Sequence, residues 1–173
     1  SVKEDPYDDR NMHYLGREYM YYGKYQECID TLIKHLSLKS AVWKDERCAS
    51  MRFIARCYKY LNRFEEANMW LEKAILEAPY LRDPFVEMML LQYELKNWDK
   101  VIINGEEALK IKHNPKTYIN ETFTYNETVY DLLSIAYYYE NNKEKALDNV
   151  NKALEINHYD NRIINNKNII LQM

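Results

Sequence analysis

Basic side chains at helical spacing are the first candidates for chemistry in this sequence. In the stretch "MRFIARCYKYLNRFEEA" (51–67), Arg52, Arg56 and Lys59 follow one another at steps of four and three residues, which brings them to one side of a helix. Guanidinium groups bind carboxylate or phosphate oxygens in pairs, so these residues and Arg17 form a candidate anion site. The alternative is a solvated face whose charges pair weakly with neighbouring carboxylates.

Tyrosines are the second candidates, because the chain has 17 of them. Tyr60, Tyr93, Tyr138 and Tyr139 are expected to form a stacking surface for sugar rings or peptide side chains, with hydroxyls available for hydrogen bonds. For any single tyrosine the alternative is that the ring fills a gap between helices and the hydroxyl reaches solvent.

Catalytic and metal-binding patterns are not found in the sequence. The four histidines are scattered, and neither a Ser/His/Asp arrangement nor a glycine-rich phosphate loop can be recognised. His35 occupies a position where a small core residue is usual, so we expect a buried or edge histidine rather than a catalytic one. The three cysteines have no CxxC spacing, which argues against a zinc site and favours reduced thiols in the cytoplasm. We therefore expect no catalytic residue, no metal and no cofactor.

Composition narrows the class of protein further. The chain of 173 residues has a formal charge of −3, with 47% apolar and 29% charged residues, which is typical of a folded protein with no broad nucleic-acid surface. Neither a membrane span nor an export signal is expected, because no apolar run is long enough and the start "SVKEDPYDDR" is charged. Few glycines and prolines favour helices throughout.

The helices that would position these side chains follow from an internal repeat. The tetratricopeptide pattern places a large apolar residue, a small residue and an aromatic in a first helix, and small and large residues in a second, followed by proline. Small residues let the two helices approach closely, and each hairpin leaves an apolar face that only its neighbour covers. The best match fills these places with Met51, Ala55, Tyr58, Ala67, Leu71 and Pro79.

The equivalent small positions Cys28, Ala67, Val101 and Ala146 are 39, 34 and 45 residues apart, so insertions fall near "SLKSAVWKDE" and "HNPKTYINETFTY". This register predicts an all-α, right-handed tetratricopeptide superhelix (α-solenoid) in a single domain, 1–173. Its expected parts are repeats at about 9–40, 46–79, 82–113 and 127–158, an insertion at about 113–126 and a capping helix at about 160–172.

Helix boundaries and the cap can also be predicted. Asp83 and Pro84 are expected to begin a helix, with the aspartate as its cap, and Pro79 to end one. In the capping helix, one side is expected to carry Ile163, Ile164, Ile170 and Leu171.

In such a superhelix the first helices of the repeats line a concave groove. The residues expected to face this groove are Arg17, Tyr21, Arg52, Arg56, Lys59, Tyr60, Tyr93, Asp131 and Tyr138. The predicted groove is therefore cationic at one end and aromatic to acidic at the other.

Several segments also resemble the tetratricopeptide region that follows the catalytic domain of bacterial family-2 glycosyltransferases. They are "YLGREYMYYGKYQECI", "AVWKDERCASMRFIARCY", "EAPYLRDP", "TYINETFTY" and "YDLLSIAYY". The resemblance implies a separate domain that transfers a sugar from a nucleotide donor, with a divalent metal on an Asp-x-Asp motif. That domain is not in this sequence.

The function expected is a non-catalytic interaction module. By resemblance it would be the accessory region of a glycosyltransferase, with its groove positioning an acceptor glycan, a protein partner or the attached catalytic domain. The alternative is a free-standing adaptor that binds a peptide segment of another protein. Sugar transfer by this chain itself is disfavoured, because residues for the donor and the metal are absent from its sequence.

Overall fold

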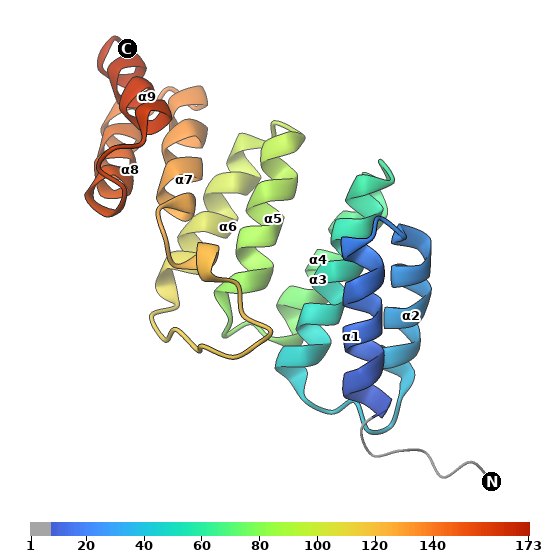
Figure 1. Cartoon of the computed structure of the whole chain (residues 1–173). Coiled ribbons are helices and arrows are strands. Elements are labelled where there is room, and N and C mark those ends of the chain that lie inside the picture. Colours follow the sequence, from blue (N-terminus) through green and yellow to red (C-terminus); the bar gives the residue numbers. More distant parts are fainter. Residues whose placement is uncertain (1–7) are drawn as a thin grey trace, which may run out of the picture. The chain divides into compact units, whose positions relative to one another are not determined.

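The computed structural model describes residues 8–173, and this part of the chain contains nine α-helices, one short 3-10 helix and no strand (Figure 1). The all-helical prediction is confirmed, with four helical hairpins followed by a ninth helix. The predicted absence of an export signal at residues 1–7 lies outside the described residues. The helices are α1 (Asp8–Tyr21), α2 (Tyr25–Ser37), α3 (Lys44–Tyr60), α4 (Phe64–Glu77), α5 (Arg82–Glu94), α6 (Trp98–Lys110), η1 (Thr122–Thr124), α7 (Thr128–Tyr139), α8 (Lys143–Ile156) and α9 (Asn161–Leu171).

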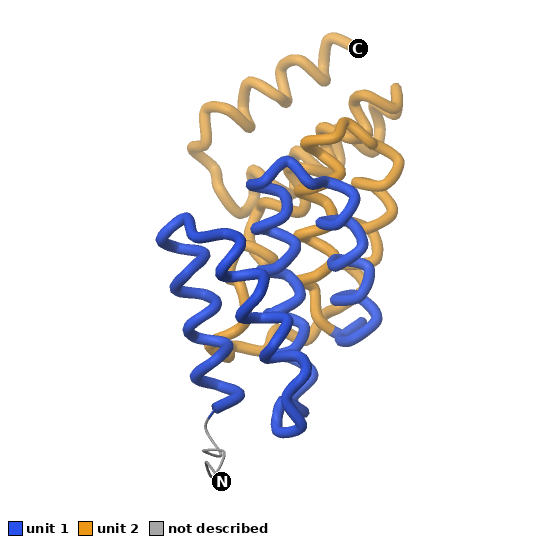
Figure 2. Tube along the Cα trace, turned by 90° about the vertical axis from the view of Figure 1, so that its right-hand side faces the viewer, with its two compact units in different colours: residues 1–80 blue, residues 81–173 orange. Residues whose placement is uncertain are grey.

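The chain divides into two compact units (Figure 2). Unit 1, residues 1–80, holds α1 to α4, and each of these helices packs against the next one along the chain. Unit 2, residues 81–173, holds α5 to α9 and η1, packed in the same way. Each unit is thus a stack of helical hairpins, and the single domain over 1–173 stays a prediction.

In every hairpin, one residue with positive φ lies in the turn two residues after the first helix. These residues are Gly23, Asn62, Lys96 and Asn141, with φ between 57° and 73°. Their spacings of 39, 34 and 45 residues equal those of the small positions in the sequence repeat, so the turns recur at the intervals of that repeat. Glycine adopts this conformation freely and asparagine tolerates it, whereas for Lys96 it is strained.

Small residues allow the helices to approach closely, as the repeat predicts. Cys28, Ala67, Val101 and Ala146 are all buried. Gly105 of α6 departs from the repeat, which calls for a large residue there, and the structure gives the reason. A methyl group at Gly105 would lie 2.6 Å from Leu133 and 2.7 Å from Met89, so these two side chains already fill the space.

An arginine holds each of the two long connections between hairpins. In unit 1, the Arg47 guanidinium donates to the carbonyl oxygens of Leu36 and Ala41, at 2.9 and 3.2 Å. In unit 2, Arg82 donates to Ile111 and Thr124 at 2.9 and 3.2 Å. Arg47 therefore joins the end of α2 to the connection that follows it, and Arg82 joins the beginning of its connection to η1.

Asp83 has a different role from the one predicted. The prediction that it caps α5 is wrong, since α5 follows Leu81 without a side-chain cap. Its carboxylate instead accepts hydrogen bonds from the Glu121 backbone N–H at 2.7 Å and from the Asn120 amide at 3.3 Å. The "RDP" segment and the insertion around residue 120 are thus one structural feature, with the acidic side chain anchoring the loop rather than the helix.

The last helix, α9, is only partly the predicted cap. Asp160 caps it by accepting from the backbone N–H groups of Arg162 and Ile163. Ile163 and Ile170 are buried as expected, but Ile164 and Leu171 are 37% and 48% exposed. Since α9 packs mainly against α8, the buried side of the helix is narrower than the sequence pattern predicts.

Candidate functional site

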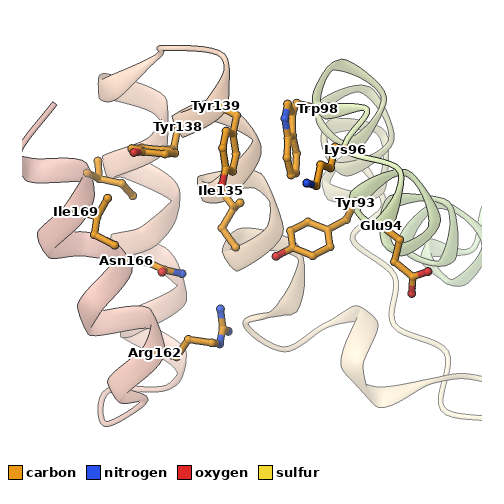
Figure 3. Close-up of a pocket in the computed structure, with 11 residues that line it drawn as sticks. Tyr93, Glu94, Lys96, Trp98, Ile135, Tyr138, Tyr139, Arg162, Asn166 and Ile169 are labelled. Atoms are coloured by element: carbon orange, nitrogen blue, oxygen red, sulfur yellow. The ribbon is translucent and has the colours of Figure 1, made fainter.

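A cleft of about 600 Å³ opens in unit 2 between α5, α7 and α9 (Figure 3). Its walls are mainly aromatic and aliphatic, with a few polar side chains at the edges. The lining residues are Tyr93, Glu94, Lys96, Trp98, Ile135, Tyr138, Tyr139, Arg162, Asn166, Ile169 and Ile170. Two of the predicted groove residues, Tyr93 and Tyr138, are among them.

The aromatic rings of the cleft support one another. Trp98 and Tyr139 stack face to face, with ring centroids 4.3 Å apart and an interplanar angle of 5°. Tyr93 meets Trp98 edge-on at 72°, and Tyr138 meets Tyr139 edge-on at 80° (Figure 3). Offset and edge-on pairs are favourable arrangements for such rings, so these walls are formed before any ligand binds.

An ion pair closes one side of the cleft. Arg162 of α9 binds both carboxylate oxygens of Asp131 on α7, at 3.2 and 2.5 Å. This hydrogen bonding raises the pKa of the arginine above its ordinary value. Asp131 is 7% exposed, so the prediction that it faces an open groove is wrong: α9 covers it and supplies its counter-charge. The ion pair instead ties α9 to α7.

Several donor groups of the cleft have no hydrogen-bond partner among the described residues. They belong to the hydroxyls of Tyr93, Tyr138 and Tyr139, the indole of Trp98, the amide of Asn166 and the ammonium of Lys96. These groups lie on half-buried or exposed side chains, where solvent satisfies them until a ligand replaces the water.

The predicted cationic residues of unit 1 gather around a buried ring pair. His13 stacks on Phe53 with centroids 5.6 Å apart, and the Arg56 guanidinium lies 5.2 Å from the Phe53 ring. Burial is the main cause of the lowered pKa of His13, and the nearby positive charge of Arg17 lowers this pKa further. Arg17 and Arg56 are half-buried, and each is able to reach solvent.

The remaining predicted residues of unit 1 lie toward the ends of α1 and α3. Tyr21 and Tyr60 are 66% and 53% exposed, and Tyr60 stacks on Tyr25 with centroids 4.9 Å apart. Lys59 is half-buried, with its ammonium 5.9 Å from the Tyr60 ring. We call Arg17, Tyr21, Arg56, Lys59 and Tyr60 the cationic face of unit 1.

Arg52 does not belong to this face. The prediction that it points outward is wrong, because the side chain is 1% exposed and its guanidinium lies against Phe53. Ten of the 17 residues of α3 are buried, so the helix is enclosed on more than one side. Counting helical positions assumes a single buried stripe, and this assumption fails for α3.

A polar network inside unit 1 unites residues that the sequence leaves apart. Ser50 bridges two histidines, with its hydroxyl 2.7 Å from Nδ1 of His13 and 2.8 Å from Nδ1 of His35, and His35 Nε2 lies 3.2 Å from Glu46. Of the two positions expected for His35, buried or at an edge, the structure shows the buried one, and all four residues are 3% exposed or less. A serine, a histidine and a carboxylate thus meet, but a substrate has no access to them.

Sequence reasoning missed Trp98, Lys96, Arg162 and Asn166. Trp98 is the first residue of α6, the second helix of its hairpin, whereas the predicted groove residues all lie on the first helices of the hairpins. Asn166 and Arg162 lie on α9, which the pattern presents only as a cap. The adjacent aromatics Tyr138 and Tyr139, facing a helix rich in asparagine, were the signal that α9 forms one wall of a site.

Solved structures with the same arrangement of helices confirm the repeat. A crystal structure of MamA superposes with a TM-score of 0.69 at 20% identity, covering 91% of this chain and 82% of that chain. PilF of Pseudomonas aeruginosa gives 0.70 at 14% identity, covering 95% and 68%. A putative kinesin light chain of Podosopora anserina, with nearly identical TPR-like repeats, gives 0.65 at 18% identity, covering 88% and 76%. The chain has a tetratricopeptide-repeat fold.

At these identities the tetratricopeptide-repeat likeness establishes the fold and leaves the function to be argued from the cleft. No protein-family model and no curated protein matches the chain significantly. Among the described residues of this tetratricopeptide-repeat structure, no helix combines the length and apolarity needed to cross a membrane. The same residues contain no group of three or more potential metal ligands.

Proposed function

We propose that the chain is an interaction module that binds a peptide segment of another protein in the cleft between α5, α7 and α9. The observation that carries this proposal is the set of preformed aromatic walls with donor groups that have no hydrogen-bond partner among the described residues. A volume of about 600 Å³ lies within the range of roughly 300–1,000 Å³ that is usual for ligand sites, and accommodates several side chains of a peptide.

The apolar walls supply the binding energy and the polar edges supply the orientation. Ile135 and Ile169 line the cleft beside the rings, and each apolar ligand group that they bury contributes about 25 cal/mol per Å². Asn166 carries both a donor and an acceptor, the combination that matches a peptide group. A bound segment therefore places a side chain among the rings and its backbone along α9.

A peptide selection tests this function. Linear peptides selected from a random library on the whole chain are expected to bind to the wild type, and to lose about tenfold or more in affinity to the Tyr138→Ala variant. Tyr159→Ala is the matched control, since this tyrosine is 89% exposed in the same unit and outside the cleft. Equal affinity for both variants would show that the peptides bind elsewhere.

The cationic face of unit 1 is proposed as a separate contact surface for an acidic partner. Arg17 and Arg56 attract carboxylate or phosphate groups, and the tyrosines beside them offer apolar contact. Charge reversal at Arg56 is expected to weaken binding of an acidic partner mainly through a slower association rate, and to do so less at high salt. Arg63, which already pairs with Glu66 at 2.7 Å, is the control for a change of net charge.

Glycan binding is the second candidate function. Aromatic rings with hydroxyls are suited to stacking on sugars, and the resemblance to glycosyltransferase accessory regions favours an acceptor glycan for an attached catalytic domain. Saccharide titration followed by NMR tests it, with shifts expected at Tyr93, Trp98 and Tyr138. If the NMR signals do not shift on addition of saccharide, peptide binding remains the proposed function. A domain with an Asp-x-Asp motif encoded upstream of this chain would support the accessory role in a glycosyltransferase.

A further inference from the structure

The rings of the cleft form flat-sided slots. Tyr93 and Tyr138 stand at 72° and 80° to their neighbours Trp98 and Tyr139, so flat faces meet nearly at right angles. These rings are fixed by one another, and a flexible ligand would lose conformational entropy when it is ordered between them. Small rigid rings fit such slots best, and the pyrrolidine ring of proline is the rigid ring that a peptide supplies.

The hydrogen-bonding groups of the cleft are mostly donors. Trp98, Asn166 and Lys96 supply N–H groups, and the tyrosine hydroxyls donate as readily as they accept. Among the described lining residues, Glu94 brings the one carboxylate, and Figure 3 shows it directed away from the rings. A matching ligand therefore offers acceptors and few donors.

A proline-rich segment has this chemistry. Prolyl residues carry no backbone N–H, and in the polyproline II conformation their carbonyl groups make no internal hydrogen bonds. The carbonyls point outward at every residue, so a donor-rich wall binds them without leaving ligand donors unpaired. The conformation is also preformed, which lowers the ordering cost of binding.

Other ligands fit the cleft less well. An acidic segment gains little there, because Asp131 already neutralises Arg162 and the remaining charges, Lys96 and Glu94, are of opposite sign. A helical segment uses its own carbonyls internally and would leave the Trp98 and Asn166 donors unpaired. A saccharide brings many hydroxyl donors, and the cleft offers few acceptors for them, namely the Asn166 oxygen, the Glu94 carboxylate and the tyrosine hydroxyls.

We propose that the segment bound in this cleft is proline-rich and lies in the polyproline II conformation. This inference rests on the proposed function and specifies its partner. Prolyl rings pack against Tyr93, Tyr138 and the Trp98–Tyr139 stack, and the carbonyls between them accept hydrogen bonds from the Trp98 indole and the Asn166 amide.

Fluorescently labelled L-decaproline, titrated with the whole chain and followed by anisotropy, is the direct probe. Saturable binding is expected for L-decaproline, at least about tenfold stronger than for a glycine–serine peptide of the same length. D-decaproline, which forms the mirror-image helix, is expected to bind no better than the glycine–serine peptide. NMR of the unlabelled complex is expected to shift the Trp98 indole N–H signal.

Substitutions locate the site. Tyr138→Ala and Asn166→Ala are expected to weaken L-decaproline binding about tenfold and about threefold, and Tyr159→Ala to leave it unchanged. Circular dichroism confirms that each variant is folded, and the Trp98 signal of the wild type provides an independent readout. If L- and D-decaproline bind equally, or neither binds, the proline inference is overturned. If library peptides still bind the cleft in that case, the proposed function stands without the proline inference. If neither decaproline nor the library peptides bind the cleft, both the proline inference and the proposed function are wrong.

Discussion

At the scale of single residues, the buried His13–Ser50–His35–Glu46 network stabilises unit 1 rather than acting on a ligand. Each side chain is satisfied by its neighbours, which is the condition for burying polar groups without a large penalty. The network also explains how two histidines far apart in the sequence occupy a core otherwise filled with apolar residues.

Burial lowers the pKa of His13 to about 4, and nearby charges modify it: Glu46 raises the value, while His35, Arg17 and Arg52 lower it. The unfolded chain, with an ordinary pKa near 6.5, therefore binds a proton that the folded chain does not, and stability falls as pH drops from about 6.5 towards 4. The loss is expected to reach about 3 kcal/mol. Urea unfolding at several pH values measures it, and the slope should flatten in His13→Asn. An unchanged slope in that variant would assign the effect to another group.

Arg52 and Arg56 are expected to respond differently to charge reversal. Arg52→Glu puts the opposite charge at a side chain that is 1% exposed, and is expected to cost about 3–5 kcal/mol of unfolding free energy. Arg56→Glu, at a half-buried position, is expected to cost about 1 kcal/mol or less. Unfolding midpoints compare the two, and similar losses would contradict the placement of Arg52 in the interior. Partner binding is therefore best tested at Arg56.

At the scale of elements, the helices were predictable and the connections were not. The repeat sets where each hairpin turns, because small and large residues must alternate between paired helices. The repeat pattern does not indicate that Arg47 and Arg82 hold the connections, since the groups they bind there are backbone carbonyls, which any residue type supplies; Arg47 also pairs with Glu77 at 2.6 Å. The segments "RDP" and "TYINETFTY" were each noticed in the sequence, but only the structure shows that Asp83 joins them.

Replacing Arg82 is expected to loosen one connection alone. Arg82→Lys keeps the charge but cannot reach both Ile111 and Thr124, and a loss of about 2 kcal/mol is expected from hydrogen bonds of a charged donor. Hydrogen exchange is expected to accelerate over residues 112–127. The matched variant Arg47→Lys should accelerate exchange over 38–43 instead. Uniform acceleration across a whole unit would mean that the arginine stabilises the fold generally.

Lys96 is the turn residue least suited to its backbone. Its φ of 57° costs a lysine about 1 kcal/mol relative to glycine, part of which the greater freedom of glycine in the unfolded chain offsets. Lys96→Gly is therefore expected to stabilise the protein by about 0.5 kcal/mol, seen as a higher urea midpoint. Asn62→Gly is the control and should give less, because asparagine tolerates the left-handed region. A lower midpoint for Lys96→Gly would show that its side chain contributes to folding.

At the scale of the whole molecule, the sequence predicted the fold well and the binding site only in part. Tyr93 and Tyr138 were expected in a groove and line the cleft, whereas Asp131 and Arg52 were expected there and are buried. The difference has one cause: whether a residue of a first helix is exposed or buried depends on the helices packed beside it, as α9 is beside Asp131, and helical periodicity does not reveal these neighbours.

The distribution of cysteines and tryptophans gives each unit its own reporter. All three cysteines lie in unit 1 with 0% exposure, and a hydrogen bond with Cys28, together with burial, raises the pKa of the Cys57 thiol above its ordinary value. The thiols of the folded protein are therefore expected to resist alkylation, so that the rate of pulsed thiol labelling measures the opening of unit 1 alone.

With Trp43 and Trp70 replaced by phenylalanine, the fluorescence of Trp98 reports on the unfolding of unit 2 in the same sample. In a repeat protein stabilised by nearest neighbours, the two signals are expected to separate as urea increases. Coincident transitions would instead identify one cooperative folding unit.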